Sequence, residues 1–524
     1  MNILFVLYGD FGSNSANPLV LYARELHSLG HSCAVAVPFG VETVRQHDSP
    51  KFRPVLFSEA LKAPDSIFPD KRPADVIHAC TPRENIRRFV TSYMAKRPTP
   101  LVIYLEDNES WIATRALGFD PPTLVRHTEA EISAQLPNQL AHPFFYDSFI
   151  GLADAVAVIQ DKLRTKVPPW VSSTTVLIGT DVQFFSPRQS NPARRAKYGI
   201  GKSDKVIVYH GGMNEFTRPS IRTLCEAVGL INRQGYTCRL LRSGPFALDF
   251  LAQMSPETKL VISDVGLLPR QELPDFLALA DVFVQPGQID PFEDFRLPGK
   301  VAEFLAMGRP VVLPNVNIAD LFRDGENALL LNRGSADEIA AKCIELFANP
   351  QLAREIGRAG REFAEKFFDV RCQARRLEDV YRAARDQFNP AIASETWRDA
   401  NEKTPVALLL AAKLKLLAAS NPKSELAPGD LLSEHARYIE LMQQRVEGLQ
   451  AAIAERDANE RNAHILSLTR QIAERDSRMS ELNRALDGLL NSFSWKITRP
   501  LRVAKAVVKL ARQRIDTFWR HRSK

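Results

Sequence analysis

The sequence predicts an α/β fold made of two Rossmann-like domains, each a parallel sheet covered by helices. Short apolar runs alternate with segments of helical periodicity over residues 1–368, which is the pattern of parallel βαβ units. Glycines directly follow the first apolar run of each half, as they do in Rossmann-like nucleotide-binding units. Residues 186–204 are polar and contain Pro and Gly, so they predict a linker between domains 1–185 and 205–368.

Length and composition limit the class of protein. A chain of 524 residues is too long for one ordinary domain, and its 45% hydrophobic and 25% charged residues are typical of a soluble globular protein. The six cysteines are scattered, which favours reduced thiols over a disulfide framework or a zinc site. The start MNILFVLYGD predicts a first strand rather than a signal peptide. The sequence has no apolar run of about 18 residues, so we expect no membrane-spanning helix.

The positive charge is concentrated at one end of the chain. Residues 491–524 contain ten Lys or Arg and one acid, which is 10 − 1 = +9, so the formal charge of +7 leaves 7 − 9 = −2 for the rest. A polyanionic partner is therefore expected to meet this tail.

In the first half, apolar runs predict strands that alternate with helices. The predicted strands are Ile3–Tyr8, Cys33–Val37, Val76–Ala79, Leu101–Leu105 and Ala155–Ile159. Gly9 and Gly12 form a turn before a helix at Pro18–Leu29; this turn fits a nucleotide-binding loop, and it also fits a simple tight turn. Glu106, Asp107 and Glu109 follow a predicted strand. They would bind sugar hydroxyls or form a solvated acidic turn.

In the second half, glycines again follow apolar strands. The predicted strands are Val206–His210, Arg239–Leu241, Val261–Ser263, Val282–Val284 and Val311–Leu313. Gly211, Gly212 and Gly244 lie just past two of them, where a backbone without Cβ atoms lets a phosphate approach closely. Arg218 begins the next predicted helix, either as a phosphate ligand or as an exposed helix-start residue.

A helix that opens at Pro298 and Gly299 is the centre of the predicted site. It follows a charged, aromatic loop at Asp290–Leu297 and ends at Gly308, as proline at a helix start and glycine at a helix end predict. Its first turn offers free N–H groups to a phosphate. Lys300 and Glu303 share one face, so they would hold a diphosphate and ribose hydroxyls, or form an ordinary surface salt pair.

The segment PGKVAEFLAMGRPVV resembles the donor-binding motif of the GT-B glycosyltransferases, especially the retaining enzymes of glycosyltransferase family 4. The resemblance covers about residues 1–388 and implies a GT-B fold, a nucleotide-sugar donor, and Glu303 on the nucleotide ribose. The first glutamate of the family motif falls at Phe295, so the resemblance points to the adjacent acids Glu293 and Asp294 for that catalytic role. Asp107 stands where the family commonly has a histidine in the sugar pocket.

The resemblance also implies which groups meet the donor phosphates. Met213 occupies the place of the usual arginine, so Arg218 and Lys300 are the expected basic pair. The glycines expected around the donor are Gly12, Gly211, Gly212, Gly244 and Gly299. The chain contains no Asp-x-Asp motif, so we expect a reaction without a metal ion and without a cofactor other than the donor.

The chain after residue 368 divides into four further predicted segments. Residues 369–388 predict a charged helix, which by the resemblance to GT-B enzymes would cross back onto the first domain, and 389–430 predict a helical connector. Apolar residues spaced three and four apart over 431–490 predict a coiled coil and a homo-oligomer, although a lone amphipathic helix packed on the enzyme also fits. The tail at 491–524 is a basic amphipathic helix with tryptophans, which favours an anionic membrane over a partner protein or nucleic acid.

These features predict a retaining glycosyltransferase that extends a cell-surface glycan. SFSWKITRPLR resembles a C-terminal signature of bacterial polysaccharide glycosyltransferases, which implies a glycan or lipid-linked glycan acceptor and a peripheral position on the inner face of the cytoplasmic membrane. The altered positions Phe295, Met213 and Asp107 leave an inactive GT-B scaffold as an alternative. A sugar-nucleotide epimerase explains the body of the chain but not the tail.

Overall fold

The computed structural model describes residues 1–119, 127–245, 250, 253–316 and 321–401, and individual positions beyond them at 403, 406, 409, 410, 412, 413, 416 and 509. The chain forms two compact units. The first, residues 1–124 and 129–439, holds both sheets. In the second, residues 125–128 and 440–524, the structure describes positions 127, 128 and 509 alone, so the predicted coiled coil and most of the predicted tail lie outside the described residues.

The first sheet has seven parallel strands in the order β3-β2-β1-β4-β5-β6-β7. Its strands are β1 (Asn2–Val6), β2 (Ser32–Val37), β3 (Arg53–Leu56), β4 (Val76–Cys80), β5 (Leu101–Leu105), β6 (Ala155–Val158) and β7 (Ser173–Thr175). The helices along this part of the chain are α1 (Ala16–Ser28), α2 (Phe57–Lys62), α3 (Glu84–Met94), α4 (Glu109–Ala116), α6 (Glu129–Gln135) and α7 (Tyr146–Gly151).

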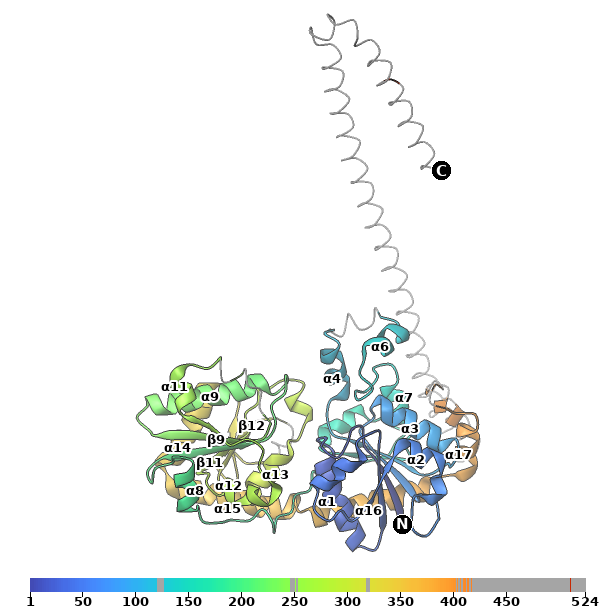
Figure 1. Cartoon of the computed structure of the whole chain (residues 1–524), viewed down its shortest axis with the longest axis horizontal. Coiled ribbons are helices and arrows are strands. Elements are labelled where there is room, and N and C mark those ends of the chain that lie inside the picture. Colours follow the sequence, from blue (N-terminus) through green and yellow to red (C-terminus); the bar gives the residue numbers. More distant parts are fainter. Residues whose placement is uncertain are drawn as a thin grey trace, which may run out of the picture. The chain divides into compact units, whose positions relative to one another are not determined.

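The second sheet has six parallel strands in the order β10-β9-β8-β11-β12-β13. Figure 1 labels β9, β11 and β12 of this sheet, with helices such as α9 and α13 around it. They are β8 (Lys205–His210), β9 (Cys238–Ser243), β10 (Ile262–Asp264), β11 (Val282–Val284), β12 (Val311–Pro314) and β13 (Leu329–Leu331). The helices are α8 (Pro192–Lys197), α9 (Arg218–Arg233), α11 (Pro256–Leu260), α12 (Leu273–Leu277), α13 (Gly299–Ala306), α14 (Ala336–Ala348), α15 (Pro350–Phe367), α16 (Val370–Gln387) and α17 (Pro390–Trp397). Two parallel sheets with helices confirm the predicted α/β fold class.

Each sheet is buried on both faces, and the strand sequences show why. All five residues of β1 are buried, as expected for a central parallel strand covered by helices on both sides. Side chains of β8 alternate between two cores: Val206 and Val208 lie in one, and Ile207 and Tyr209 lie in the other with residues of α9 and α14. Because this period-two alternation places apolar side chains on both faces of the strand, polar side chains gather at the carboxyl ends of the strands.

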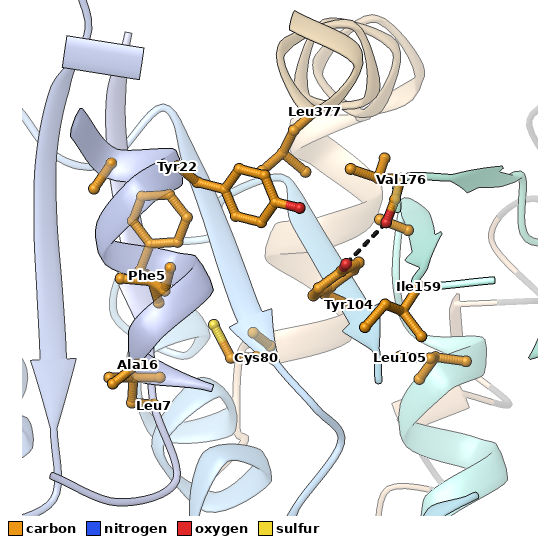
Figure 2. Close-up of a cluster of buried hydrophobic side chains, with 14 of the residues drawn as sticks. Phe5, Leu7, Ala16, Tyr22, Cys80, Tyr104, Leu105, Ile159, Val176 and Leu377 are labelled. Carbon is orange, nitrogen blue, oxygen red and sulfur yellow. Dashed lines mark hydrogen bonds between the residues drawn. The ribbon is translucent and has the colours of Figure 1, made fainter. Parts of the chain in front are cut away.

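The helix α16 packs against the first sheet and α1, although it follows the second domain in sequence. Its start is held by two backbone hydrogen bonds, from the Thr180 N–H to the Phe368 carbonyl (2.7 Å) and from the Val370 N–H to the Thr180 carbonyl (3.0 Å). Gly179 allows this approach, because a Cβ there would lie 2.8 Å from the Val370 Cα. Figure 2 shows Leu377 of α16 in the apolar cluster of the first domain.

Buried hydrogen bonds link the layers of this cluster. The Tyr104 hydroxyl donates to the Val176 carbonyl (2.8 Å; Figure 2), and the Tyr22 hydroxyl donates to the Leu177 carbonyl (2.7 Å). The Tyr381 hydroxyl of α16 contacts His78 Nδ1 at 2.8 Å. Burial lowers the pKa of His78 to about 3, so this histidine is neutral and serves the packing between β4 and α16.

Residues beyond α16 also belong to the body of the first domain. Trp397 at the end of α17 is 2% exposed and joins the same core as Val406 and Leu410. Lys413 Nζ donates to the Leu152 carbonyl (2.6 Å) and pairs with Asp154 Oδ1 (3.0 Å). The first part of the predicted connector 389–430 is therefore a packed element.

Replacing Trp397 by alanine should lower the free energy of unfolding by about 3–5 kcal/mol, the usual cost of removing a buried tryptophan. Urea denaturation followed by circular dichroism measures this change. Glu395→Ala is the matched control, because Glu395 lies on the same helix with its side chain 47% exposed. Equal stability of both variants would show that this segment is dispensable for the fold.

Candidate active site

The carboxyl ends of β8, β9 and β11 form one edge of the second sheet, where ligands of open α/β sheets bind. Gly211 follows β8 with φ +136°, and Gly244 follows β9 with φ +116°. A Cβ on Gly244 would lie 2.7 Å from the carbonyl carbon and oxygen of Gly211. Both positions therefore require glycine, and the two loops pack directly on each other.

Lys300 lies over this pair of loops. Its Nζ donates to the Tyr209 hydroxyl (2.9 Å) and lies 4.3 Å from the centre of the Tyr209 ring. A Cβ on Gly211 would meet Lys300 Nζ at 2.6 Å. The structure thus brings together Gly211, Gly244 and Lys300, which the sequence assigned to the donor phosphates. Gly212 is adjacent, and a Cβ there would meet only Pro245 Cδ, at 3.9 Å.

Glu303 lies one turn further along α13, between two cationic or ionisable groups. Its Oε2 is 3.8 Å from His210 Nε2 and its Oε1 is 4.0 Å from Arg270 Nη1. Burial raises the pKa of Glu303, while Arg270 and Lys300 lower it. Within the described residues, Lys300 and Glu303 form no ion pair with each other, which argues against the simple salt-pair interpretation.

His210 is neutral in this arrangement. Burial lowers its pKa to about 4, and the charges of Lys300, Arg270 and Arg242 add to the effect. Its Nδ1 is buried and has no hydrogen-bond partner within the described part of the chain. A neutral histidine and a carboxylate that makes only long contacts leave hydrogen-bonding capacity for hydroxyl groups of a ligand.

The two acids expected beside the sugar are both held in ion pairs. Glu293 is buried, and its Oε1 accepts from Arg296 at 2.8 Å; burial raises the pKa of Glu293, and Arg296 opposes this. Asp294 pairs with Lys162 of the first domain. Phe295 lies under Lys162 and Lys166, whose Nζ atoms are 5.4 and 5.2 Å from its ring centre.

Asp107 is the third candidate acid, and it lies after β5 in a group of carboxylates in which Glu109 is buried and Glu106 and Asp107 are half-buried. Burial and the charge of Glu109 together raise the pKa of Asp107 to about 6, although Arg296 and Arg83 lower it. Glu109 pairs with Arg83 at 3.0 Å, and Glu106 accepts from the Ser15 hydroxyl at 2.5 Å. No hydrogen bond to the Asp107 carboxylate occurs within the described residues, so it is the candidate acid whose oxygens remain open to a ligand.

The loop before α13 reaches the first domain, which explains the effect of Arg296 on Asp107. Asn108 Nδ2 donates to the Pro291 carbonyl at 3.1 Å. Trp111 stacks on Phe292 with 5.3 Å between ring centres, and Phe216 packs on both at 5.8 and 5.6 Å. Strand-end residues from both sheets therefore contribute to one site.

Three other predicted site residues have the following contacts. The Gly12 N–H donates to Asp10 Oδ1 at 3.0 Å, which is a tight-turn contact. The Arg218 guanidinium lies 5.6 Å from the Phe250 ring centre, in a hollow of about 530 Å³ also lined by Met213, Asn214 and Arg222. A Cβ on Gly299 would meet Ile178 Cδ1 at 2.9 Å, so Gly299 serves the approach of the first domain to α13.

Sequence reasoning missed the arginines that organise the site. Arg242 and Arg270 flank the donor loops, Arg296 holds Glu293, and Arg83 holds Glu109. Arg242 alone carried a signal, as a charged residue at the end of an apolar strand. Within the described residues, no group of three or more His, Cys, Asp or Glu side chains is placed to hold a metal ion, and no helix has both the length and the apolarity to cross a bilayer.

Comparisons with known proteins agree with this architecture. Residues 204–349 match the family model described as Glycosyl transferases group 1. The putative glycosyltransferase EpsD of Bacillus subtilis is 26% identical over 212 residues, 40% of this chain and 54% of that protein. A GDP-mannose-dependent alpha-(1-6)-phosphatidylinositol monomannoside mannosyltransferase of Mycolicibacterium smegmatis is 27% identical over 228 residues, 40% of this chain and 56% of that protein. The chain thus spans little more than half the length of these relatives.

Solved structures show the same fold over a longer part of the chain. HepE of Anabaena, solved in complex with UDP-glucose, superposes with a TM-score of 0.55 at 15% identity, over 73% of this chain and 100% of that one. The sucrose-phosphate synthase of Thermosynechococcus elongatus has a TM-score of 0.56 at 16% identity, over 73% and 98% of the two chains. The fold is GT-B, and residues 204–349 of its second half resemble the Glycosyl transferases group 1 family.

Proposed function

We propose that this protein is a glycosyltransferase that transfers a sugar from a nucleotide-sugar donor to a glycan or lipid-linked glycan acceptor. The observation that carries the proposal is the position of Lys300 over Gly211, at the start of a helix whose next turn presents Glu303. A cation and free N–H groups suit a diphosphate, and the carboxylate suits ribose hydroxyls. The structure of HepE with UDP-glucose and the GDP-mannose-dependent relative give further support, because UDP-glucose and GDP-mannose are both nucleoside diphosphate sugars.

We propose a retaining reaction that needs no metal ion. The developing charge on the leaving diphosphate would be stabilised by Lys300 and the first turn of α13, which are in place before reaction. Glu293 and Asp294 are each held in an ion pair, with Arg296 and Lys162, and we assign neither of them the role of nucleophile. The acceptor hydroxyl would then attack on the face of the leaving group and pass its proton to the departing phosphate.

Incubating the protein with a panel of UDP- and GDP-sugars tests this proposal. We expect hydrolysis or transfer from at least one donor, with the anomeric configuration retained by NMR and the rate unchanged in EDTA. Turnover that EDTA abolishes and Mg²⁺ or Mn²⁺ restores would contradict the metal-free site. Absence of turnover with every donor would favour the inactive scaffold, and 2-epimerised products would favour the epimerase.

We further propose that the tail at 491–524 holds the enzyme on the inner face of a bacterial cytoplasmic membrane, and that 431–490 forms the homo-oligomer. The sequence pattern supports both proposals. Each basic residue near an anionic surface contributes about 1 kcal/mol, and oligomerisation raises the effective concentration of tails. The protein without residues 491–524 should therefore no longer sediment with anionic liposomes, while the full chain should do so and release in high salt. Sedimentation of the truncated protein would place the anchor elsewhere.

A further inference from the structure

Arg242 is buried directly beneath the two glycine loops of the proposed donor site. It lies near the end of β9, is 1% exposed, and extends its guanidinium under the loops rather than into solvent. Its Nη2 donates to the carbonyls of Gly211 (3.0 Å) and Pro245 (2.6 Å), and its Nη1 donates to the carbonyl of Gly244 (3.1 Å) and to Asp264 Oδ1 (3.2 Å). One side chain thus holds both loops by three of their carbonyl oxygens.

These contacts determine where the adjoining peptide N–H group points. In a trans peptide the C=O and N–H groups point in opposite directions, and the structure has no cis peptide bond within its described residues. Because the Gly211 carbonyl points at Arg242, the Gly212 N–H points away from it. No acceptor for this N–H occurs within the described part of the chain, so it is available to an anion.

The guanidinium also places a positive charge under the site. Burial lowers the pKa of Arg242, and Asp264 offsets this, but an arginine remains protonated in proteins. Its charge contributes to the low pKa of His210 at the neighbouring strand end. Removing a cation from water is costly, and the three carbonyl contacts and Asp264 compensate for part of that cost. A bound dianion would compensate further.

We infer that Arg242 is a positioning residue and an internal counter-ion for the diphosphate of the donor. This inference rests on the proposed function and assigns the diphosphate a specific support. Lys300 meets the diphosphate from the side of α13, while Arg242 orients the Gly212 N–H and contributes charge from below.

The test compares affinities for UDP and UMP, and for GDP and GMP, by isothermal titration calorimetry on the full chain. The dissociation constant of the monophosphate divided by that of the diphosphate isolates the contribution of the second phosphate. Arg242→Gln should reduce this ratio by about tenfold or more, on the scale of hydrogen bonds to charged groups, and Arg242→Lys should restore part of it. Arg239→Gln is the control, because Arg239 lies on the same strand and also pairs with an acid, Asp204 at 3.3 Å; it should leave the ratio unchanged.

Asp264→Asn separates the counter-ion role of Arg242 from a purely structural role. It also tests the inference if the Arg242→Gln protein does not fold. Asparagine retains an oxygen for Arg242 and for the Gly266 N–H (3.0 Å) but removes the negative charge, so diphosphate binding should tighten. A folded Arg242→Gln protein with an unchanged ratio would overturn the inference, as would weaker diphosphate binding by Asp264→Asn. A wild-type protein that binds neither UDP nor GDP would instead overturn the proposed function, and the inference with it.

Discussion

Replacing Lys300 by methionine should lower kcat/KM for the nucleotide sugar by about 10²–10³-fold, the usual effect of removing one group that stabilises developing charge. Lys300 Nζ is held over Gly211 by the Tyr209 hydroxyl and ring, so its charge is already in position when the diphosphate departs. Methionine keeps the apolar stem against Tyr209 and removes only the charge. The loss should therefore appear in turnover rather than in folding.

Steady-state kinetics with the productive donor measure this effect, and thermal denaturation checks the fold. Lys205→Met is the matched control, because Lys205 begins the same strand β8 and its Nζ lies 5.6 Å from the Phe347 ring centre. Glu303→Ala should weaken binding of the donor by about 1–3 kcal/mol, through the nucleoside rather than the diphosphate. Unchanged kinetics in both site variants would remove α13 from the donor site.

Replacing Glu106 by glutamine should stabilise the protein at alkaline pH. Burial and the charges of Asp107 and Glu109 together raise the pKa of Glu106 to about 8, although Ser15 and Arg83 lower it. The unfolded chain releases this proton near pH 4.5, so between about pH 4.5 and 8 the folded state binds more protons than the unfolded state. The free energy of unfolding must then fall as pH rises through this window, and glutamine removes that contribution.

Urea denaturation from pH 5 to 9 measures the difference. One pKa unit corresponds to about 1.4 kcal/mol, so the variant should be a few kcal/mol more stable at pH 9 and nearly equal to wild type at pH 5. Glu42→Gln, at an exposed acid of the same domain, should leave the pH dependence of the wild type unchanged. If Glu106→Gln shows the same pH dependence of stability as the wild type, the pKa of Glu106 is not raised in the folded state.

The sequence predicted most of the strands from their short apolar runs. The expected strand at Ile3–Tyr8 is β1 at Asn2–Val6, and the expected strand at Val282–Val284 has the same bounds in β11. The strands β3, β7 and β13 were missed. The sequences of β3 (RPVL) and β7 (STT) are short and partly polar, and β3, β7 and β13 lie at sheet edges, where one side lacks a neighbouring strand and residue choice is less constrained.

The sequence by itself determined the features that depend on neighbours along the chain. These are the alternation of strands and helices, the glycines after β8 and β9, and the common face of Lys300 and Glu303, because strand and helix periods relate residues only a few positions apart. Only the tertiary structure decided which charged groups remain available to a ligand. Asp294 pairs with Lys162, 132 positions away, and Arg242 reaches the Gly211 carbonyl, 31 positions away. The Arg242 contact follows from the order of strands in the second sheet, where β8 and β9 are neighbours, and the Lys162 contact joins loops of the two different sheets. No local spacing in the sequence records either contact.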